Sequence, residues 1–159
     1  MEQPGSIQQM TETIQNTWTT WEAMIRQVDQ EKFNSPGAAG EWSLKDIIAH
    51  ITWHEKEMVR LVEAHALVGS ELRNLPTDER NTVIYVEVRD LPLEQVLADS
   101  TQVHQQLLDA LPSLSDADLT DPTDFTNMPP DWQPWLVIAQ NTYEHYQDHI
   151  KDVELWLAE

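Results

Sequence analysis

Residues 43–62 read SLKDIIAHITWHEKEMVRLV and carry the strongest helical signal in the chain. Ser43 followed by Asp46 three residues later resembles a capping box at a helix N-terminus. The apolar residues recur at steps of three and four, which is typical of the buried face of an α-helix. They are Leu44, Ile47, Ile48, Ile51, Met58, Leu61 and Val62. We therefore expect a long amphipathic helix that begins at Ser43 and ends before Gly69, where glycine can terminate a helix.

Three further segments show the same periodicity. They run from about Ser6 to Glu31, from about Leu91 to Leu111 and from about Pro134 to Leu157. Loops rich in Pro, Gly and Asp separate the helical segments, and the longest of these loops covers residues 113–133. Four long helices without a convincing sheet predict an all-α, up-down four-helix bundle with a long irregular connection before the fourth helix.

Residues 83–88, VIYVEV, are rich in β-branched side chains and resemble a strand. A lone strand would have no partner to pair with in an otherwise helical chain. We therefore expect a short helix here, or a lead-in to the third long helix.

Four of the six histidines form two pairs at a spacing of four residues. His50 and His54 belong to the second predicted helix, and His145 and His149 belong to the fourth. Residues four apart lie on the same face of a helix. Neutral imidazole is the commonest protein ligand of divalent metals. The two pairs therefore predict a metal site between the two helices.

Helix geometry alone leaves open which histidines face inward. At about 100° per residue, His54 and His149 fall within the apolar stripes of their helices, whereas His50 and His145 lie at the edges. An inward histidine needs a partner, because an unpaired buried polar group costs about 1–3 kcal/mol. Three or four histidines that converge from two helices can satisfy one another through one cation.

Other side chains carry weaker signals. Glu57, one turn past His54, leaves a proton-transfer role open. His65 and His104 have no partner at helical spacing, so we expect them at the surface or in packing. No Gly-rich phosphate loop and no Ser-His-Asp set can be assigned.

The composition excludes several classes of partner. With 28 Asp and Glu against 9 Lys and Arg, the net charge of -19 repels phosphate backbones and anionic lipids, so we expect neither nucleic acid nor membrane as a partner. No basic and apolar signal-peptide pattern begins the chain, which favours the cytoplasm. The absence of cysteine excludes disulfides and thiolate metal ligands. A length of 159 residues fits a single domain over residues 1–159.

Three stretches resemble a known superfamily. Residues 40–51, GEWSLKDIIAHI, look like the start of the second helix of DinB-like (YfiT-like) proteins, and residues 141–150, NTYEHYQDHI, look like the signature of their fourth helix. Asp78-Glu79-Arg80-Asn81 also fits the ClbS/DfsB-like branch. The resemblance spans nearly the whole chain in order and spacing.

This resemblance implies a four-helix bundle, frequently a homodimer, in which one histidine of helix two and an HxxxH pair of helix four hold zinc, nickel or a similar divalent metal. Carried over by position, these metal ligands are His50, His145 and His149. The implied function is a metal-dependent enzyme acting on a small electrophilic molecule, by transfer of a low-molecular-weight thiol or by hydrolysis. The alternative is a non-catalytic small-molecule-binding or self-protection protein of the DinB/ClbS-like type.

Overall fold

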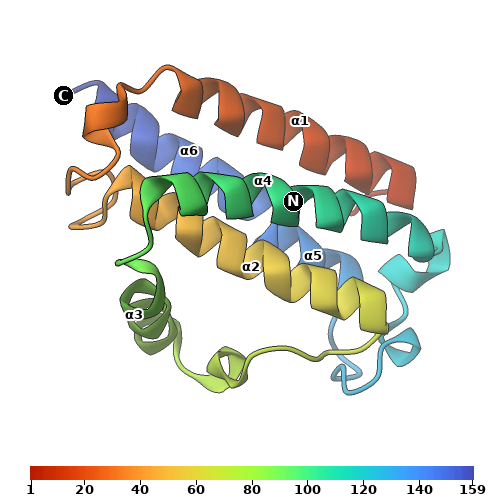
Figure 1. Cartoon of the computed structure of the whole chain (residues 1–159). Helices are drawn as coiled ribbons and strands as arrows, with labels where there is room; N and C mark the ends of the chain where they lie inside the picture. The colour runs from red at the N-terminus through yellow and green to blue at the C-terminus, as the bar shows by residue number, and fades with distance from the viewer.

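The computed structural model describes residues 1–159 and contains six α-helices and no β-strand (Figure 1). Single turns of 3-10 helix at Gln30–Lys32, Glu71–Asn74, Leu111–Ser113, Asp116–Leu119 and Pro122–Asp124 punctuate the connections. None of the α-helices combines the length and the apolar character that crossing a lipid bilayer requires. The six α-helices are α1 (Ile7–Arg26), α2 (Leu44–Ala64), α3 (Thr77–Val88), α4 (Leu93–Ala110), α5 (Pro134–Asn141) and α6 (Tyr143–Leu157).

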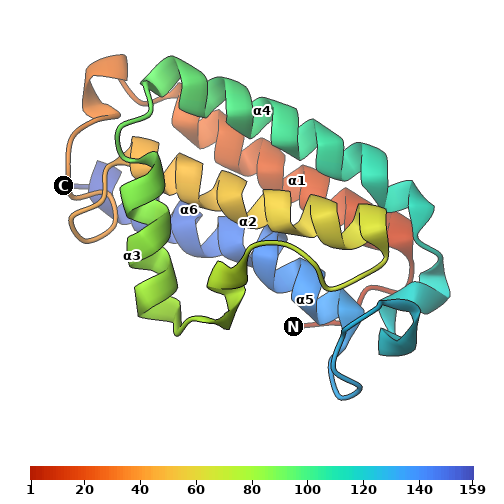
Figure 2. The ribbon, with the colours of Figure 1, turned by 60° about the horizontal axis from the view of Figure 1, so that its bottom comes forward.

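The bundle consists of α1, α2, α4 and the nearly continuous pair α5 and α6, as expected from the four periodic segments (Figures 1 and 2). The colours show that α1 and α6 run in one direction and that α2 and α4 run in the other. Because α2 and α4 are parallel, residues 65–92 must return to the end of the bundle where α2 began. This long connection contains α3, which crosses α2 on the outside of the bundle (Figure 2). The all-α bundle is as predicted, but its helix directions differ from the up-down alternation that we expected.

Residues 83–88 are helical, as predicted, and belong to α3. A strand would leave its backbone groups unpaired at the side of the bundle, whereas the helix satisfies them internally. Tyr85 of α3 stacks on Trp42, with ring centroids 5.9 Å apart, and so holds α3 against the start of α2.

The prediction of one continuous fourth helix over residues 134–157 is wrong. The helix is interrupted at Thr142, whose φ of -128° and ψ of -107° lie outside the α-helical region. The Thr142 hydroxyl donates to the carbonyl of Ile138 at 2.7 Å, so it is satisfied by the preceding turn. Side-chain periodicity does not reveal this interruption, because both halves of the segment are amphipathic.

The N-terminus of α2 is closed by the expected capping box. The backbone N–H of Asp46 donates to the Ser43 hydroxyl at 3.2 Å, and the N–H of Ser43 donates to the Asp46 carboxylate at 2.9 Å. The helix ends at Ala64, earlier than Gly69, because His65 adopts a left-handed conformation with φ of 45°. The first helix also ends early, at Arg26 rather than near Glu31.

A polar group lies within the hydrophobic core between the four bundle helices. Glu55 of α2 is fully buried, and its Oε2 accepts from the His104 Nδ1–H at 2.8 Å and from the Tyr146 O–H at 2.7 Å. Trp18 of α1 stacks on His104 at 3.9 Å between ring centroids. His104 is thus a packing residue, as expected, and one carboxylate connects α2 with α4 and α6.

Loss of the capping box should destabilise the protein measurably. Ser43→Ala leaves the N–H of Asp46 without its acceptor, so we expect the free energy of unfolding to fall by about 1 kcal/mol in urea titrations. Ser113→Ala is the matched control, because Ser113 is exposed and caps no α-helix. Equal midpoints for the two variants would contradict the role of the cap.

Candidate metal centre

The structure brings together three of the predicted histidines. His50 lies on the second turn of α2, and His145 and His149 lie on the first two turns of α6. One ring nitrogen from each residue falls within a group whose members are all within 4.8 Å of one another. The Nε2 atoms of His145 and His149 face each other at 3.1 Å. This group contains no carboxylate and is the candidate metal site.

The rotation of α6 explains why this pair faces α2. Tyr146 points into the core to reach Glu55, and the buried face of α6 continues through Ile150 and Val153. His145 and His149 are each one residue before a member of this face, so helix geometry turns both histidines towards the same neighbouring side. The core contact of Tyr146 therefore also orients the histidine pair.

Asp152 orients His149 from one turn further along α6. The His149 Nδ1–H donates to the Asp152 carboxylate at 3.1 Å, which leaves Nε2 with a free lone pair directed at the cluster. Carboxylates commonly align metal-binding histidines in this way and increase their basicity. Sequence analysis missed Asp152 because acidic residues are common throughout the chain.

His54 lies beside the cluster but is held by a different partner. Its Nδ1–H donates to the Asn141 side-chain oxygen at 2.8 Å, and Asn141 is in turn bonded to the carbonyl of Val137. Its ring centroid is 4.6 Å from that of His145. His50 and His54 are both buried, so the position in the apolar stripe does not separate them. The structure groups His50, rather than His54, with the α6 pair.

Burial keeps these imidazoles neutral. It lowers the pKa of His50 from 6.5 to about 2 and that of His54 to about 4, and it lowers the pKa of His145 well below its usual value. The neighbouring histidines add repulsion between protonated rings at His50 and His145. The pKa of His149 is lowered by burial and partly restored by Asp152. Metal binding needs neutral imidazole, so the site is in its binding-competent protonation state.

The residues present fit a divalent ion. The Nδ1 atoms of His50 and His145 are buried without any hydrogen-bond partner. Such orphaned atoms cost about 1–3 kcal/mol each, which is unusual for a buried cluster that serves packing alone. Three nitrogens at about 2.0–2.1 Å from a tetrahedral zinc ion lie about 3.3 Å from one another. The His145 and His149 Nε2 atoms, 3.1 Å apart, are near this spacing, and all three ligand nitrogens lie within 4.8 Å of one another.

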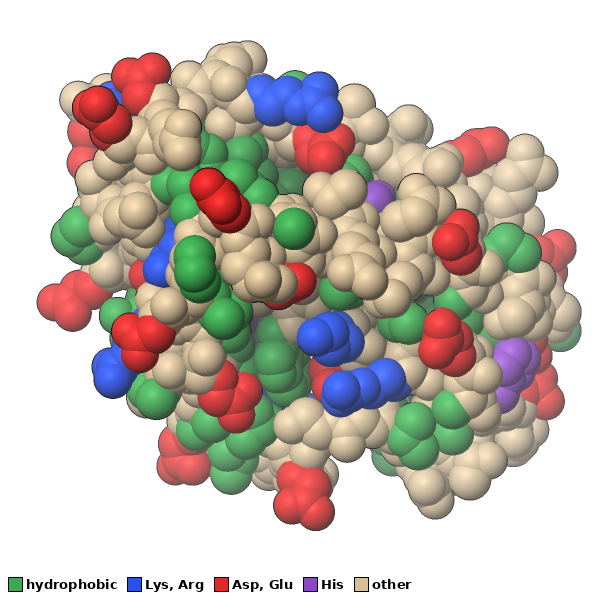
Figure 3. All heavy atoms as spheres, in the orientation of Figure 1, with side chains coloured by type: hydrophobic (Ala, Val, Ile, Leu, Met, Phe, Trp, Pro, Cys, Tyr) green, Lys and Arg blue, Asp and Glu red, His purple; other side chains and the backbone are tan.

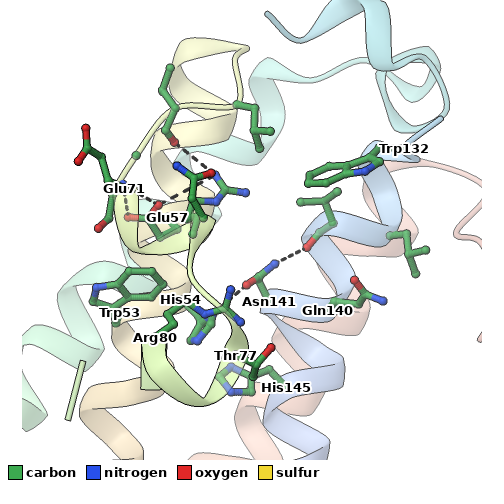
Figure 4. A pocket seen from close by; sticks show the side chains of 18 of the residues that line it. Trp53, His54, Glu57, Glu71, Thr77, Arg80, Trp132, Gln140, Asn141 and His145 are labelled. Atoms are coloured by element: carbon green, nitrogen blue, oxygen red, sulfur yellow. Dashed lines mark hydrogen bonds and ion pairs between the residues drawn. The ribbon is translucent and has the colours of Figure 1, made fainter. Parts of the chain in front are cut away.

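The cluster opens into a cavity of about 860 Å³ (Figure 4). The side of α2 forms one wall and α5 forms the opposite wall, while α3 and the segment that precedes it complete the enclosure. Trp53 and Trp132 lie on opposite sides of the cavity. This arrangement gives a small molecule access to His50 and His145, which both line it.

Glu57 does not have the geometry of a proton-transfer group. Its carboxylate pairs with Arg60 at 2.8 Å and Arg73 at 4.0 Å and accepts from the backbone N–H of Ser70. Gly69 has a φ of 147°, and a Cβ there would collide with this carboxylate. Glu57 thus holds the segment after α2 in place, which is why only glycine suits position 69.

The fold and the site together define an all-helical bundle with a three-histidine cluster at the side of its core. The sequence model of the DinB superfamily matches residues 9–153. The chain therefore belongs to the DinB superfamily.

Two solved structures share the fold. One is an uncharacterised protein from Escherichia coli UTI89, which is 14% identical with a TM-score of 0.74 and is matched over 96% of this chain and 93% of that chain. The other is named Sibling Lethal Factor Precursor - DfsB, and is 17% identical with a TM-score of 0.74 over 96% of this chain and 95% of that chain. No curated protein matches the sequence.

Variants of the four clustered histidines should separate ligands from neighbours. We expect His50→Ala, His145→Ala and His149→Ala each to abolish binding of zinc or nickel, because two imidazoles hold a divalent ion poorly. His54→Ala should keep most of the bound metal, since His54 is tied to Asn141. The measurement is elemental analysis after metal loading and desalting. His65→Asn is the control, since asparagine tolerates the left-handed backbone at this position. A greater loss in His54→Ala than in His50→Ala would contradict the grouping.

The metal-free protein should lose stability in mild acid. Above pH 6.5 these histidines are neutral in the folded and in the unfolded chain. Below pH 6.5 the histidines of the unfolded chain bind protons, whereas in the folded chain His54 stays neutral down to about pH 4 and His50 down to about pH 2. Each such histidine lowers the free energy of unfolding by up to about 1.4 kcal/mol per pH unit within this window. We expect urea titrations between about pH 7 and about pH 5.5 to show a shallower loss in His54→Gln than in the native chain. Identical slopes would show that His54 titrates normally in the folded state.

Proposed function

We propose that the protein binds one divalent metal ion, zinc or nickel, through His50, His145 and His149, and that it acts on a small electrophilic molecule bound in the adjacent cavity. The observation that carries this proposal is the convergence of three neutral imidazoles at the wall of a cavity of about 860 Å³. Buried polar clusters are costly unless they are satisfied, and a cation is the simplest partner for three lone pairs. Cavities with a few convergent polar groups are the usual places of ligand binding.

A divalent cation held by three neutral imidazoles keeps its full charge and lowers the pKa of a water molecule or thiol that reaches it. The side chains of the protein supply orientation and shielding. Asp152 aligns His149, and Asn141 holds His54 against the cluster. Trp53 and Trp132 provide flat apolar surfaces for the body of a substrate.

Two reactions suit this arrangement. The first is transfer to the electrophile of a low-molecular-weight thiol, which would have to come from solution because the chain has no cysteine. The second is hydrolysis, which needs only water. No carboxylate faces the cluster as an obvious general base, since Glu57 is engaged by Arg60 and Arg73. This favours a nucleophile that ionises readily, and we therefore place thiol transfer first.

The alternative is a protein that binds an electrophilic or toxic small molecule without turning it over. The cavity and the missing general base are compatible with this role. The similarity to the structure named Sibling Lethal Factor Precursor - DfsB is one of fold, so it supports the alternative only weakly.

Turnover assays discriminate between thiol transfer, hydrolysis and binding without turnover. We expect the metal-loaded protein to accelerate loss of an epoxide or activated halide at least about tenfold in the presence of cysteine or glutathione. The acceleration should disappear with a chelator and in His145→Ala but not in His65→Asn. Equal rates with and without thiol would identify a hydrolase. Metal binding without turnover of any electrophile would replace the enzyme proposal by the binding-protein alternative.

A further inference from the structure

The segment Asp78-Glu79-Arg80-Asn81, on the first turns of α3, holds two buried polar atoms without a partner. These are the Nε atom of Arg80 and the side-chain oxygen of Asn81. Both residues line the cavity beside the histidine cluster.

Arg80 is the one arginine of this chain that forms no ion pair with a carboxylate. Acidic residues outnumber basic ones by 28 to 9, yet Arg80 makes no ion pair. By contrast, Arg60 and Arg73 both pair with Glu57. The other carboxylates at the cavity, Glu71 and Asp131, are exposed. A buried donor of a charged group that is left unsatisfied costs more than about 1–3 kcal/mol, so a specific acceptor is expected.

Charge is distributed differently on the surface and at the cavity. Acidic side chains are scattered over the face in Figure 3, whereas two cationic side chains lie together near its centre, over α2 and the segment that follows it. Within the cavity the charge of Arg80 reaches the histidines, since it contributes to lowering the pKa of His50, His54 and His145. Figure 4 shows Arg80 beside His54, with the cavity opening towards Trp132.

We propose that the cavity takes an anionic small molecule, whose carboxylate is bound by Arg80 and whose neighbouring polar group is bound by Asn81. The guanidinium fork matches a carboxylate in two parallel hydrogen bonds. Trp53, Trp132 and Leu136 offer apolar surface for an aromatic or aliphatic body. An anion at this place also relieves the repulsion between Arg80 and a cation on the histidines. The anion would be the substrate of the function proposed above, and only its role as a substrate depends on that function.

The test measures binding to the metal-free protein, so that it does not depend on metal or turnover. Naphthoate and the neutral naphthamide are titrated by calorimetry in the presence of a chelator. We expect naphthoate to bind the native chain at least about tenfold more tightly than naphthamide, because charge-assisted hydrogen bonds are the stronger ones. In Arg80→Gln this preference should vanish while the affinity for naphthamide is unchanged.

Two further variants complete the experiment. Arg26→Gln removes an exposed cation that pairs only with Glu22 on α1 and does not line the cavity, and it should keep the preference for naphthoate. Arg80→Lys keeps the charge without the planar fork and should keep only part of the preference. Equal affinities for the two compounds, no binding of either, or an equal loss in Arg26→Gln and Arg80→Gln would each overturn the proposal. Failure of metal binding or of turnover with a retained preference would overturn the proposed function alone.

Discussion

The buried carboxylate of Glu55 is the constraint on which the arrangement of the helices depends. Hydrogen bonds to Oε2 replace part of its hydration, while Oε1 is buried without a partner. Burial raises the pKa of Glu55, and His104 and Tyr146 oppose that effect. The two donors come from α4 and α6, and Trp18 of α1 stacks on one of them. A rotation of any of these helices by one residue would break a contact that has no substitute in an apolar core.

The same constraint positions the histidine cluster on the other side of α2 and α6. Glu55 directly follows His54, and Tyr146 directly follows His145, so each helix directs one residue into the core and its predecessor towards the cavity. The interruption at Thr142 lets α5 present Asn141 to His54 while α6 keeps its own rotation. The hydrophobic core and the histidine cluster therefore lie on two faces of the same pair of packed helices, α2 and α6.

The electrostatics of the cavity differ from those of the molecule as a whole. A chain with a net charge of -19 has an acidic surface, yet the residues around the cluster are neutral imidazoles, Trp53 and Trp132, and the unpaired Arg80. Glu57, the buried acid in this region, is neutralised by two arginines and holds the segment that leads to α3. The unpaired charge of Arg80 is the basis on which we propose a small anion as the ligand of this cavity.

The sequence by itself determined the local features of this protein. The 3.6-residue periodicity located the helical segments, the capping box located the start of α2, and the spacing of four residues paired His145 with His149. Each of these features depends only on neighbours along the chain. The resemblance in register also singled out His50, although the apolar stripe of α2 favoured His54.

Only the tertiary structure decided which groups meet across elements. In the folded chain the fourth helix is interrupted at Thr142, His54 is hydrogen-bonded to Asn141, and Arg80 of α3 lines the cavity. Periodicity gives the angle of a residue about its own helix axis, but it contains no information on how that helix is rotated against its partners. That rotation is set by packing and by the partners of buried polar groups, such as Glu55, which lie far apart in the sequence.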